Sequence, residues 1–409
     1  MDFSLEYTKE QEAFAREVRA WLDVNLPEGL ATPADPGKLS YEQYQKRREL
    51  GRRLGQKGWM APTFPSEYGG GGLTMDHAIV IEQELARHGM ALPPYYEPGI
   101  RLAAPAVLVW GAEEQKKRLL PPILKGEVVT WQLFTEPGAG SDLAGLKTTA
   151  LRDGDEFTIN GEKVFVGALH DVDQFWLLAR TDPKGQRHQN LGMFIVPAHL
   201  PGISITRLDL IAAGGEAGVS AGMKNRVRLD NVRVNGFCLI GPETGGWGVA
   251  NSTLEIEHGG AGGLFGSRIA DRFLAYCRTS PSMVKRLRDN PELADSVVEA
   301  YIDAQIERLL ALRNYWLRHA KRQRTYEGSQ YSLYRKMFGV RLTEIMLKVL
   351  GPYALTDDEE RGLEDGAFEC HQRAGIVTAP GGSAEIQKVT MARRIGVGRA
   401  AKEEAAATV

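Results

Sequence analysis

The stretch Trp131-Gln-Leu-Phe-Thr-Glu-Pro-Gly-Ala-Gly-Ser-Asp142 decides how the rest of the chain is interpreted. It begins as an apolar, β-prone run and then breaks into a Pro-Gly-Ala-Gly-Ser loop. Such a loop exposes backbone N–H groups without side-chain obstruction, and the hydroxyl of Ser141 adds a donor, so an anion such as a pyrophosphate can bind there. The rings of Trp131 and Phe134 are suited to cover a flat ring system. Taken alone, such a loop is more typical of a tight turn that binds nothing.

The composition is that of an ordinary globular protein. The 409 residues are enough for two or three domains, with 43% hydrophobic and 25% charged residues. A net charge of −2 gives no reason to expect nucleic acid or an anionic membrane as a partner. The three widely spaced cysteines form neither a disulfide framework nor a metal motif. We expect no metal site at His77, His88, His170 or His371, which lack a partner at metal-ligand spacing. We therefore expect a cytoplasmic protein without a metal site.

Residues 1–127 predict an all-helical N-terminal domain. Thr8-Lys-Glu-Gln11 fits a capping box, and apolar residues at helical spacing follow it. A basic helix over 41–57 is expected to turn its charges to solvent. The segment 90–104, with Tyr95 and Tyr96, either borders a substrate pocket or only packs between helices.

Residues 128–240 predict a middle domain of short strands, because Val, Ile, Thr and Phe cluster in runs separated by turn residues. The clearest strands are expected at 174–180, 191–196, 203–209 and 225–233. Asp153-Gly154 and Asn160-Gly161 are typical of hairpin turns, and Asn-Gly is the stronger signal of the two. The absence of long helices between the strands favours an antiparallel barrel or sandwich.

Residues 241–409 are helical again. Helices are expected at about 248–278, 292–325, 329–351 and 383–395, with a loop at 279–291. These helices predict a four-helix bundle. The fold class is therefore α+β multidomain: an N-terminal α-helical domain, a middle antiparallel β-barrel domain and a C-terminal four-helix bundle.

The order of these parts, together with an ordered series of motifs, resembles the acyl-CoA dehydrogenase family over nearly the whole chain. The motifs are Thr135-Glu-Pro-Gly-Ala-Gly-Ser-Asp142, Gly154-Asp-Glu-Phe-Thr-Ile-Asn-Gly-Glu-Lys163, Leu177-Leu-Ala-Arg-Thr-Asp182, Leu229-Asp-Asn-Val-Arg-Val234, Gly246-Trp-Gly248 and Gly381-Gly-Ser-Ala-Glu-Ile-Gln387. Several motifs in order are far more specific than any one of them. The resemblance implies an FAD-dependent enzyme that removes two hydrogens from the α and β carbons of an acyl-CoA thioester.

The resemblance implies which residues hold the flavin. On the opening stretch they are Trp131, Phe134, Thr135, Gly140 and Ser141. A second flavin segment is implied at Phe165, Val166 and Gly167, where the family has Trp-(Ile/Thr)-(Thr/Ser). Gly167 lacks the hydroxyl that usually reaches the flavin N5, which puts the tuning of the flavin in doubt more than its binding.

The adenosine and pyrophosphate end of the flavin is implied to lie at several separate positions. These are Arg278, Lys348, Gly351, Gly382, Ser383 and Glu385. In the family a neighbouring subunit completes this end, so an oligomer, a dimer or a tetramer, is expected. Lys348 and Pro352 depart from the family's pattern there, and Arg278 is equally typical of a solvated helix end.

The catalytic base is the most informative departure. Many members place a glutamate where this chain has Gly381, and glycine cannot take a proton. A second branch places it on the first long helix of the C-terminal bundle, where this chain has Glu257. The backbone N–H of Gly381 can still polarise the thioester carbonyl. Ser141, Glu255 and His258 are implied to face the substrate, and His258 replaces the family's arginine.

Two other functions remain open from the sequence. Because Gly167, Lys348, Pro352 and His258 depart from the family, the chain can be a non-catalytic or half-site subunit of a hetero-oligomer. It can also be a flavin oxidase on the same scaffold. The partners implied by the resemblance are an acyl-CoA and an acceptor such as electron-transferring flavoprotein.

Overall fold

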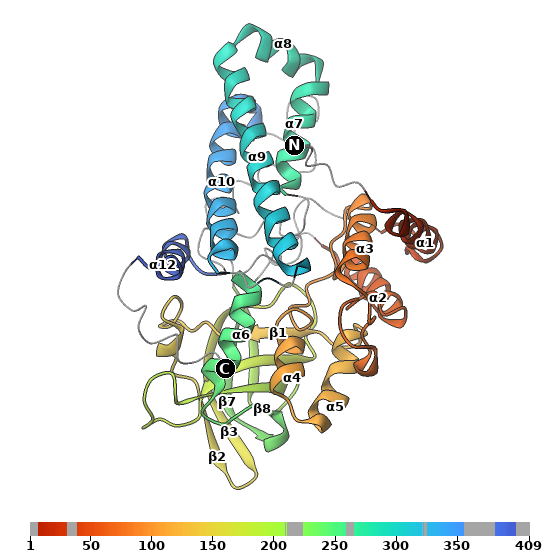
Figure 1. Ribbon diagram of the computed structural model, residues 1–409. Helices are drawn as coiled ribbons and strands as arrows, with labels where there is room; N and C mark the ends of the chain where they lie inside the picture. The colour runs from red at the N-terminus through yellow and green to blue at the C-terminus, as the bar shows by residue number, and fades with distance from the viewer. Residues whose placement is uncertain are drawn as a thin grey trace. The chain divides into compact units, whose positions relative to one another are not determined.

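The computed structural model describes residues 7–30, 39–208, 210, 224–258, 266–320, 322, 325–355 and 381–397. They belong to two compact units, of which the first runs to Ile256 and the second begins at Glu257. The first unit contains both the N-terminal helices and the β-sheet (Figure 1). The predicted division of this part of the chain near residue 128 stays a prediction.

The N-terminal helices begin where the sequence places their caps. Thr8 Oγ1 accepts from Gln11 N and Gln11 Oε1 accepts from Thr8 N, so the predicted capping box is confirmed. The helices of this part are α1 (Lys9–Asn25), α2 (Tyr41–Gln56), the 3₁₀ helix η2 (Ser66–Tyr68), α3 (Met75–Arg87), α4 (Ala103–Trp110) and α5 (Glu113–Leu124).

The prediction that the charges of α2 face solvent is wrong for two arginines. Arg47 and Arg48 are buried, at 6% and 7% exposure. The guanidinium of Arg47 donates to Pro94 O, and that of Arg48 donates to Glu127 O. These backbone carbonyls replace water around the guanidinium groups, so helical spacing alone could not separate the buried charges from the exposed ones.

The sheet of the first unit is mostly antiparallel. Its order is β6-β7-β3-β2-β4-β5-β8, and β1 pairs with β4 in parallel. The strands are β1 (Thr130–Leu133), β2 (Thr149–Asp153), β3 (Glu156–Val166), β4 (Gln174–Arg180), β5 (Leu191–Pro197), β6 (Ile203–Leu208), β7 (Lys224–Asn235) and β8 (Leu239–Ile240). Short 3₁₀ helices η3 (Leu143–Gly145) and η4 (Gly236–Cys238) connect them. Apolar residues of this sheet and of α1–α5 form one continuous core.

Asn160-Gly161 is not the hairpin turn that the sequence predicts. It lies inside β3, where the register with β7 shifts between Ile159 and Gly161. A methyl group at position 161 would come within 2.3 Å of Thr148 Oγ1, so glycine is needed for close packing rather than for a turn. The actual hairpin turn is at Asp153-Gly154, where Gly154 has a φ of +61°.

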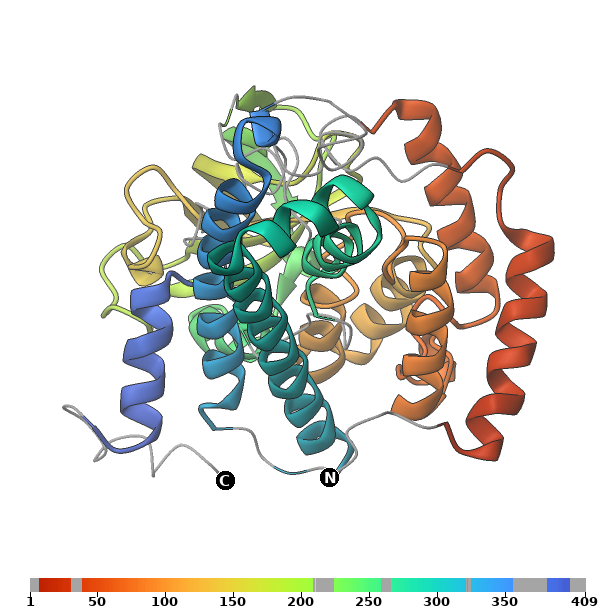
Figure 2. The same ribbon diagram turned by 90° about the horizontal axis from the view of Figure 1, so that it is seen from above.

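The second unit is helical. Its helices are α7 (Arg268–Thr279), α8 (Pro281–Asp289), α9 (Pro291–His319), α10 (Glu327–Leu350), the 3₁₀ helix η5 (Gly351–Leu355) and α12 (Ala384–Arg394). α9 and α10 lie side by side along most of their length (Figures 1 and 2). Asp303 of α9 accepts from the guanidinium of Arg341 of α10, at 2.9 Å. None of the described helices is both long and apolar enough to cross a membrane.

Two expectations for the helical part are corrected. The helix expected over 248–278 is described as two helices, α6 (Gly246–His258) and α7, because Ser267 has an extended backbone and its side chain caps the start of α7. The loop expected at 279–291 contains α8. Ser280 Oγ accepts from Met283 N and Pro281 occupies the first turn, so Ser280-Pro281 is the N-cap signal of this helix in the sequence.

Candidate cofactor site

The loop after β1 forms an open cradle. Glu136 and Ala139 exchange backbone hydrogen bonds of 3.0 and 3.1 Å, which close the turn. A methyl group built on Gly138 or Gly140 would meet nothing within 4 Å, and Gly140 and Ser141 are exposed. Within the described ranges no group accepts from the backbone N–H of Gly140 or Ser141. Packing inside the chain therefore does not require these glycines, and the open space beside their backbone leaves room for a ligand.

A buried ion pair holds the entrance to this loop. Lys163 of β3 is fully buried, and its Nζ lies 2.9 Å from Glu136 Oε1. The same Nζ donates to Phe134 O and Leu178 O, at 3.0 and 2.8 Å. Burial opposes ionisation of Glu136, but the Lys163 ammonium and donors from residues 147 and 148 outweigh it and lower the pKa of the carboxyl group. The pair therefore fixes Phe134 and Glu136 against two strands.

The second predicted segment, Phe165 to Gly167, has an unusual backbone. Phe165 has a φ of +57°, a conformation that bulky residues rarely adopt, and its side chain is 55% exposed. Val166 is buried. An exposed aromatic ring on a strained backbone is typical of a residue that contacts a ligand.

Gly167 lies directly against the indole of Trp131. Its φ is +67°, and a methyl group there would come within 2.2 Å of Trp131 Cδ2. The Trp131 side chain is 3% exposed, and its Nε1 has no hydrogen-bond partner among the described residues. The space that a side chain at position 167 would take is therefore filled by the indole.

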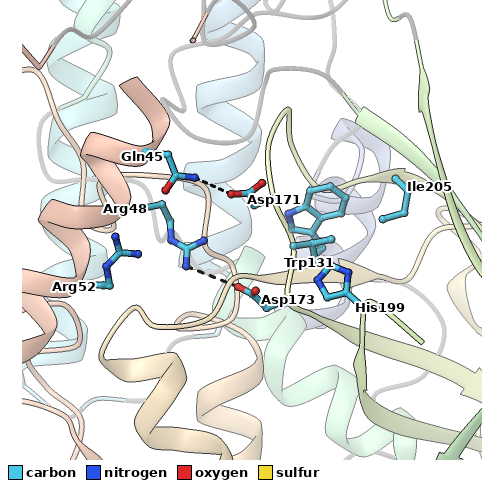
Figure 3. A pocket seen from close by; sticks show the side chains of 9 residues that line it. Gln45, Arg48, Arg52, Trp131, Asp171, Asp173, His199 and Ile205 are labelled. Carbon is cyan, nitrogen blue, oxygen red and sulfur yellow. Dashed lines mark hydrogen bonds and ion pairs between the residues drawn. The ribbon is translucent and has the colours of Figure 1, made fainter. Parts of the chain in front are cut away.

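Trp131 also forms one wall of a cavity of about 460 Å³ within the first unit (Figure 3). Gln45, Arg48 and Arg52 reach it from α2, and Asp171 and Asp173 face them from the loop before β4 (Figure 3). Val172, His199 and Ile205 complete the lining. Gln45 Nε2 donates to Asp171, at 3.0 Å, and Arg48 lies 3.8 Å from Asp173 Oδ2. Since these groups pair across the cavity, its charge is largely balanced.

The first two residues of β7, Lys224 and Asn225, hydrogen-bond to the backbone of the Phe165–Gly167 segment and of Ala168. Asn225 Nδ2 donates to Val166 O and Ala168 O, and Lys224 Nζ donates to Gly167 O at 2.9 Å. Burial lowers the pKa of Lys224 to about 8. Among the described residues Lys224 forms no ion pair.

The expected residues of the second unit lie on several of its elements. Gly381 and Gly382 have φ values of +66° and +78°, and Gln387 Nε2 donates to Gly381 O. Ser383 is the N-cap of α12, where its Oγ accepts from Ile386 N. Glu385 is exposed on the first turn of the same helix.

The other expected contacts in this unit lie on α7 and α10. Arg278 in the last turn of α7 lies over the Tyr301 ring, at 5.6 Å. Lys348 Nζ donates to Ser296 Oγ, and Gly351 ends α10 with a φ of +62°. These contacts are intramolecular, so the predicted cofactor roles of these residues stay predictions.

Glu255, Glu257 and His258 lie on α6, and their side chains are outside the described part. At the predicted base, Glu257, the structure therefore describes only the helical backbone.

The residues present fit a flavin. The cradle has open space, and the N–H groups of Gly140 and Ser141 have no partner among the described residues. Phe165 offers an exposed ring. Sequence reasoning missed the Glu136–Lys163 pair and Lys224. Both members of the pair lie in the motifs that carry the family resemblance. The alternation of buried positions along β3 is the signal that could have identified Lys163. Nothing in the local sequence pattern marks Lys224.

Comparisons with known proteins agree with this architecture. Models described as the N-terminal, middle and C-terminal domains of acyl-CoA dehydrogenase match residues 8–127, 132–229 and 244–396. The chain is 31% identical over 402 residues to acyl-CoA dehydrogenase IpdE1 of Mycobacterium tuberculosis, covering 96% of this chain and 99% of the relative. It is 30% identical over 408 residues to the protein of the same name from Mycolicibacterium smegmatis, covering 94% and 97%.

Solved structures give the same result. A "Tcur3481-Tcur3483 steroid ACAD" superimposes with a TM-score of 0.80 at 27% identity, covering 97% of this chain and 100% of the other. The ChsE4-ChsE5 complex from Mycobacterium tuberculosis gives 0.79 at 26% identity, covering 98% and 100%. The predicted helical, β and helical architecture is confirmed, and the chain belongs to the acyl-CoA dehydrogenase family of flavin-dependent oxidoreductases.

Proposed function

We propose that the protein binds FAD and removes the α and β hydrogens of an acyl-CoA thioester, with Glu257 as the base. The observation that carries this proposal is the open cradle from Gly138 to Ser141, in a chain with glycine at one family position for the base and a carboxylate at the other. The cradle supports cofactor binding, and the relocated carboxylate supports catalysis.

The flavin would be held by the first unit at the cradle, Thr135 and Phe165. When bound, it would supply the two-electron acceptor for the β hydrogen. The chain supplies donors to its phosphates at Gly140 and Ser141, and a rigid support through the Glu136–Lys163 pair. Gly351, Lys348, Arg278 and the Gly382–Glu385 turn are proposed to contact its adenosine and pyrophosphate end within a dimer or tetramer.

Proton removal is assigned to the carboxylate of Glu257. It takes the α proton of the thioester, and the backbone N–H of Gly381 stabilises the negative charge that develops on the thioester oxygen. Burial against substrate and cofactor would raise the pKa of the glutamate toward the range of an effective base. His258 gives a neighbouring charge that depends on pH, and Ser141 and Glu255 are proposed to contact the substrate.

The acyl group is proposed to be bulky. One similar structure is titled a steroid enzyme. The four glycines at positions 259, 260, 262 and 263 remove side-chain volume just after the proposed base. A polycyclic acyl-CoA is therefore the first substrate to test.

A second candidate function is that of a subunit in a hetero-oligomer. Two similar structures have titles that name two proteins each. On α9, exposed apolar side chains recur at helical spacing, at Val298, Ile302, Leu309 and Trp316, with exposures of 54%, 50%, 38% and 50%. Such a row is typical of a helix face that another chain covers.

An anaerobic spectral titration of the purified chain with straight-chain and polycyclic acyl-CoA thioesters tests the proposal. Bleaching of the oxidised flavin band by at least one thioester supports dehydrogenation by the chain alone. Bound FAD that no thioester reduces, with activity regained on adding a related subunit, supports the second candidate. Rapid reoxidation of the reduced flavin by oxygen, without electron-transferring flavoprotein, would identify an oxidase.

A further inference from the structure

Lys224 lies between two segments that the proposed function brings to the reaction. Its Nζ donates to Gly167 O, at 2.9 Å, in the segment expected to contact the flavin. The same Nζ lies 5.0 Å from the ring centroid of Tyr96, in the segment 90–104 expected to border the acyl group. The lysine therefore lies where cofactor and acyl group are expected to meet.

The charge of Lys224 is uncompensated in the described part of the chain, where no carboxylate forms an ion pair with it. Lys224 is half-buried, and the part of its surface withdrawn from water lowers its pKa to about 8. Withdrawing a cation from water without a counter-charge is unfavourable unless another group repays the lost hydration. An ammonium has three donors, and the Gly167 carbonyl occupies one of them.

The backbone on both sides of the carbonyl that Lys224 contacts has a second support. Asn225 is buried, and its Nδ2 already donates to Val166 O and Ala168 O, at 3.1 and 2.9 Å. The carbonyls on both sides of Gly167 are thus fixed by the amide. Apart from the Gly167 carbonyl and the face of the Tyr96 ring, no described group contacts the ammonium, so donors remain for a ligand.

We infer that Lys224 determines acyl specificity by binding an oxygen remote from the thioester, either a carboxylate or a ketone of the acyl group. The inference deepens the proposed function and rests on it. The ammonium donates to the distal oxygen, and the Tyr96 ring packs against the adjacent carbon chain. A plain alkyl chain would leave the ammonium without a partner, so it should bind less well.

Three thioesters of equal chain length test this: glutaryl-CoA with a terminal carboxylate, levulinyl-CoA with a ketone, and pentanoyl-CoA with neither. Binding to the FAD-loaded protein is measured calorimetrically, for wild type, Lys224→Met, Lys224→Arg and Lys184→Met. Lys184 is an exposed lysine of a loop in the same unit and serves as the control.

We expect wild type and Lys184→Met to prefer at least one oxygen-bearing thioester over pentanoyl-CoA. Lys224→Met should bind that thioester roughly tenfold more weakly, with pentanoyl-CoA changed by less than about twofold. Lys224→Arg should keep most of the preference. Which of the two thioesters loses affinity shows whether the oxygen is a carboxylate or a ketone.

Equal binding of all three thioesters by wild type and Lys224→Met would overturn the inference and leave the proposed function intact. Weaker FAD binding in Lys224→Met, with the thioester preference unchanged, would also overturn it, because Lys224 would then support the cofactor. Loss of folding in both Lys224 variants would assign the residue a structural role instead. If wild type binds neither these three thioesters nor a polycyclic acyl-CoA, the proposed function fails and the inference fails with it.

Discussion

The indole of Trp131 covers the backbone of Gly167 so closely that a methyl group at position 167 would come within 2.2 Å of Trp131 Cδ2. The large residue on β1 and the missing side chain at the end of β3 are therefore one feature. The hydroxyl that the family usually carries at this position cannot be restored here while the indole stays in place.

Gly167→Ser should accordingly destabilise the protein. The new side chain meets the Trp131 ring, and its backbone must keep a φ of +67°. We expect a loss of about 2–4 kcal/mol, the sum of overpacking and backbone strain. Urea unfolding measures it, and Trp131→Ala combined with Gly167→Ser should cost less than the two single changes added together. Strict additivity would show that the contact is absent in solution.

Gly140→Ala also replaces a glycine of the proposed cofactor site, but at a position where the added side chain has open space. A methyl group there meets nothing within 4 Å, so the melting temperature of the protein without FAD should change little. FAD affinity should fall, because the methyl group occupies the proposed path of the phosphates along the backbone. Fluorescence titration with FAD checks this. Unchanged affinity would remove the cradle from the proposed cofactor site.

Lys163→Met should strongly destabilise the first unit. It leaves the buried Glu136 carboxylate without the ammonium 2.9 Å away, and breaking a buried ion pair typically costs about 3–5 kcal/mol. Lys147→Met, which changes an exposed lysine near the same loop, is the control. Denaturant unfolding of both variants measures the difference, and equal stability of the two would refute the role of the pair.

Much of the fold follows from local patterns, and the errors show where those patterns fail. Alternating and fully apolar runs located β4 through β7 within two residues. The hairpin turn predicted at Asn160-Gly161 was wrong, because glycine is required there by contact with Thr148, which is distant in sequence. The predicted loop at 279–291 was wrong although Ser280-Pro281 is a local N-cap signal.

The site could be predicted only where one motif supplies it. The cradle and Phe165 belong to contiguous stretches, so the sequence alone predicts them as cofactor contacts. Arg48 and Lys224 take their surroundings from carbonyls and rings far away along the chain, so no local spacing marks them. The partner of a buried charge is a property of the packed structure.

Glu97 should make stability depend on pH. It is 2% exposed, and burial raises its pKa to about 8, against about 4.3 in an unfolded chain. Between these values the folded state holds a proton that the unfolded state has lost, so this carboxyl group makes stability fall as pH rises from about 4.3 to 8.

Glu97→Gln removes this dependence, because the amide does not titrate. The variant should gain stability relative to wild type as pH rises across that window. Melting temperatures between pH 5 and 8.5 test this, with Glu67→Gln on the exposed surface as the control. A constant difference between variant and wild type over the whole range would contradict the raised pKa.

The central claim is that Glu257 replaces the base missing at Gly381, and flavin reduction in Glu257→Gln tests it most directly. Wild type and variant, both loaded with FAD, are mixed anaerobically with a thioester that reduces the wild type. The account predicts that the variant binds FAD and thioester but that its flavin reduction slows by roughly a thousandfold or more, because the amide cannot take the α proton. Reduction at a rate near that of the wild type would contradict it.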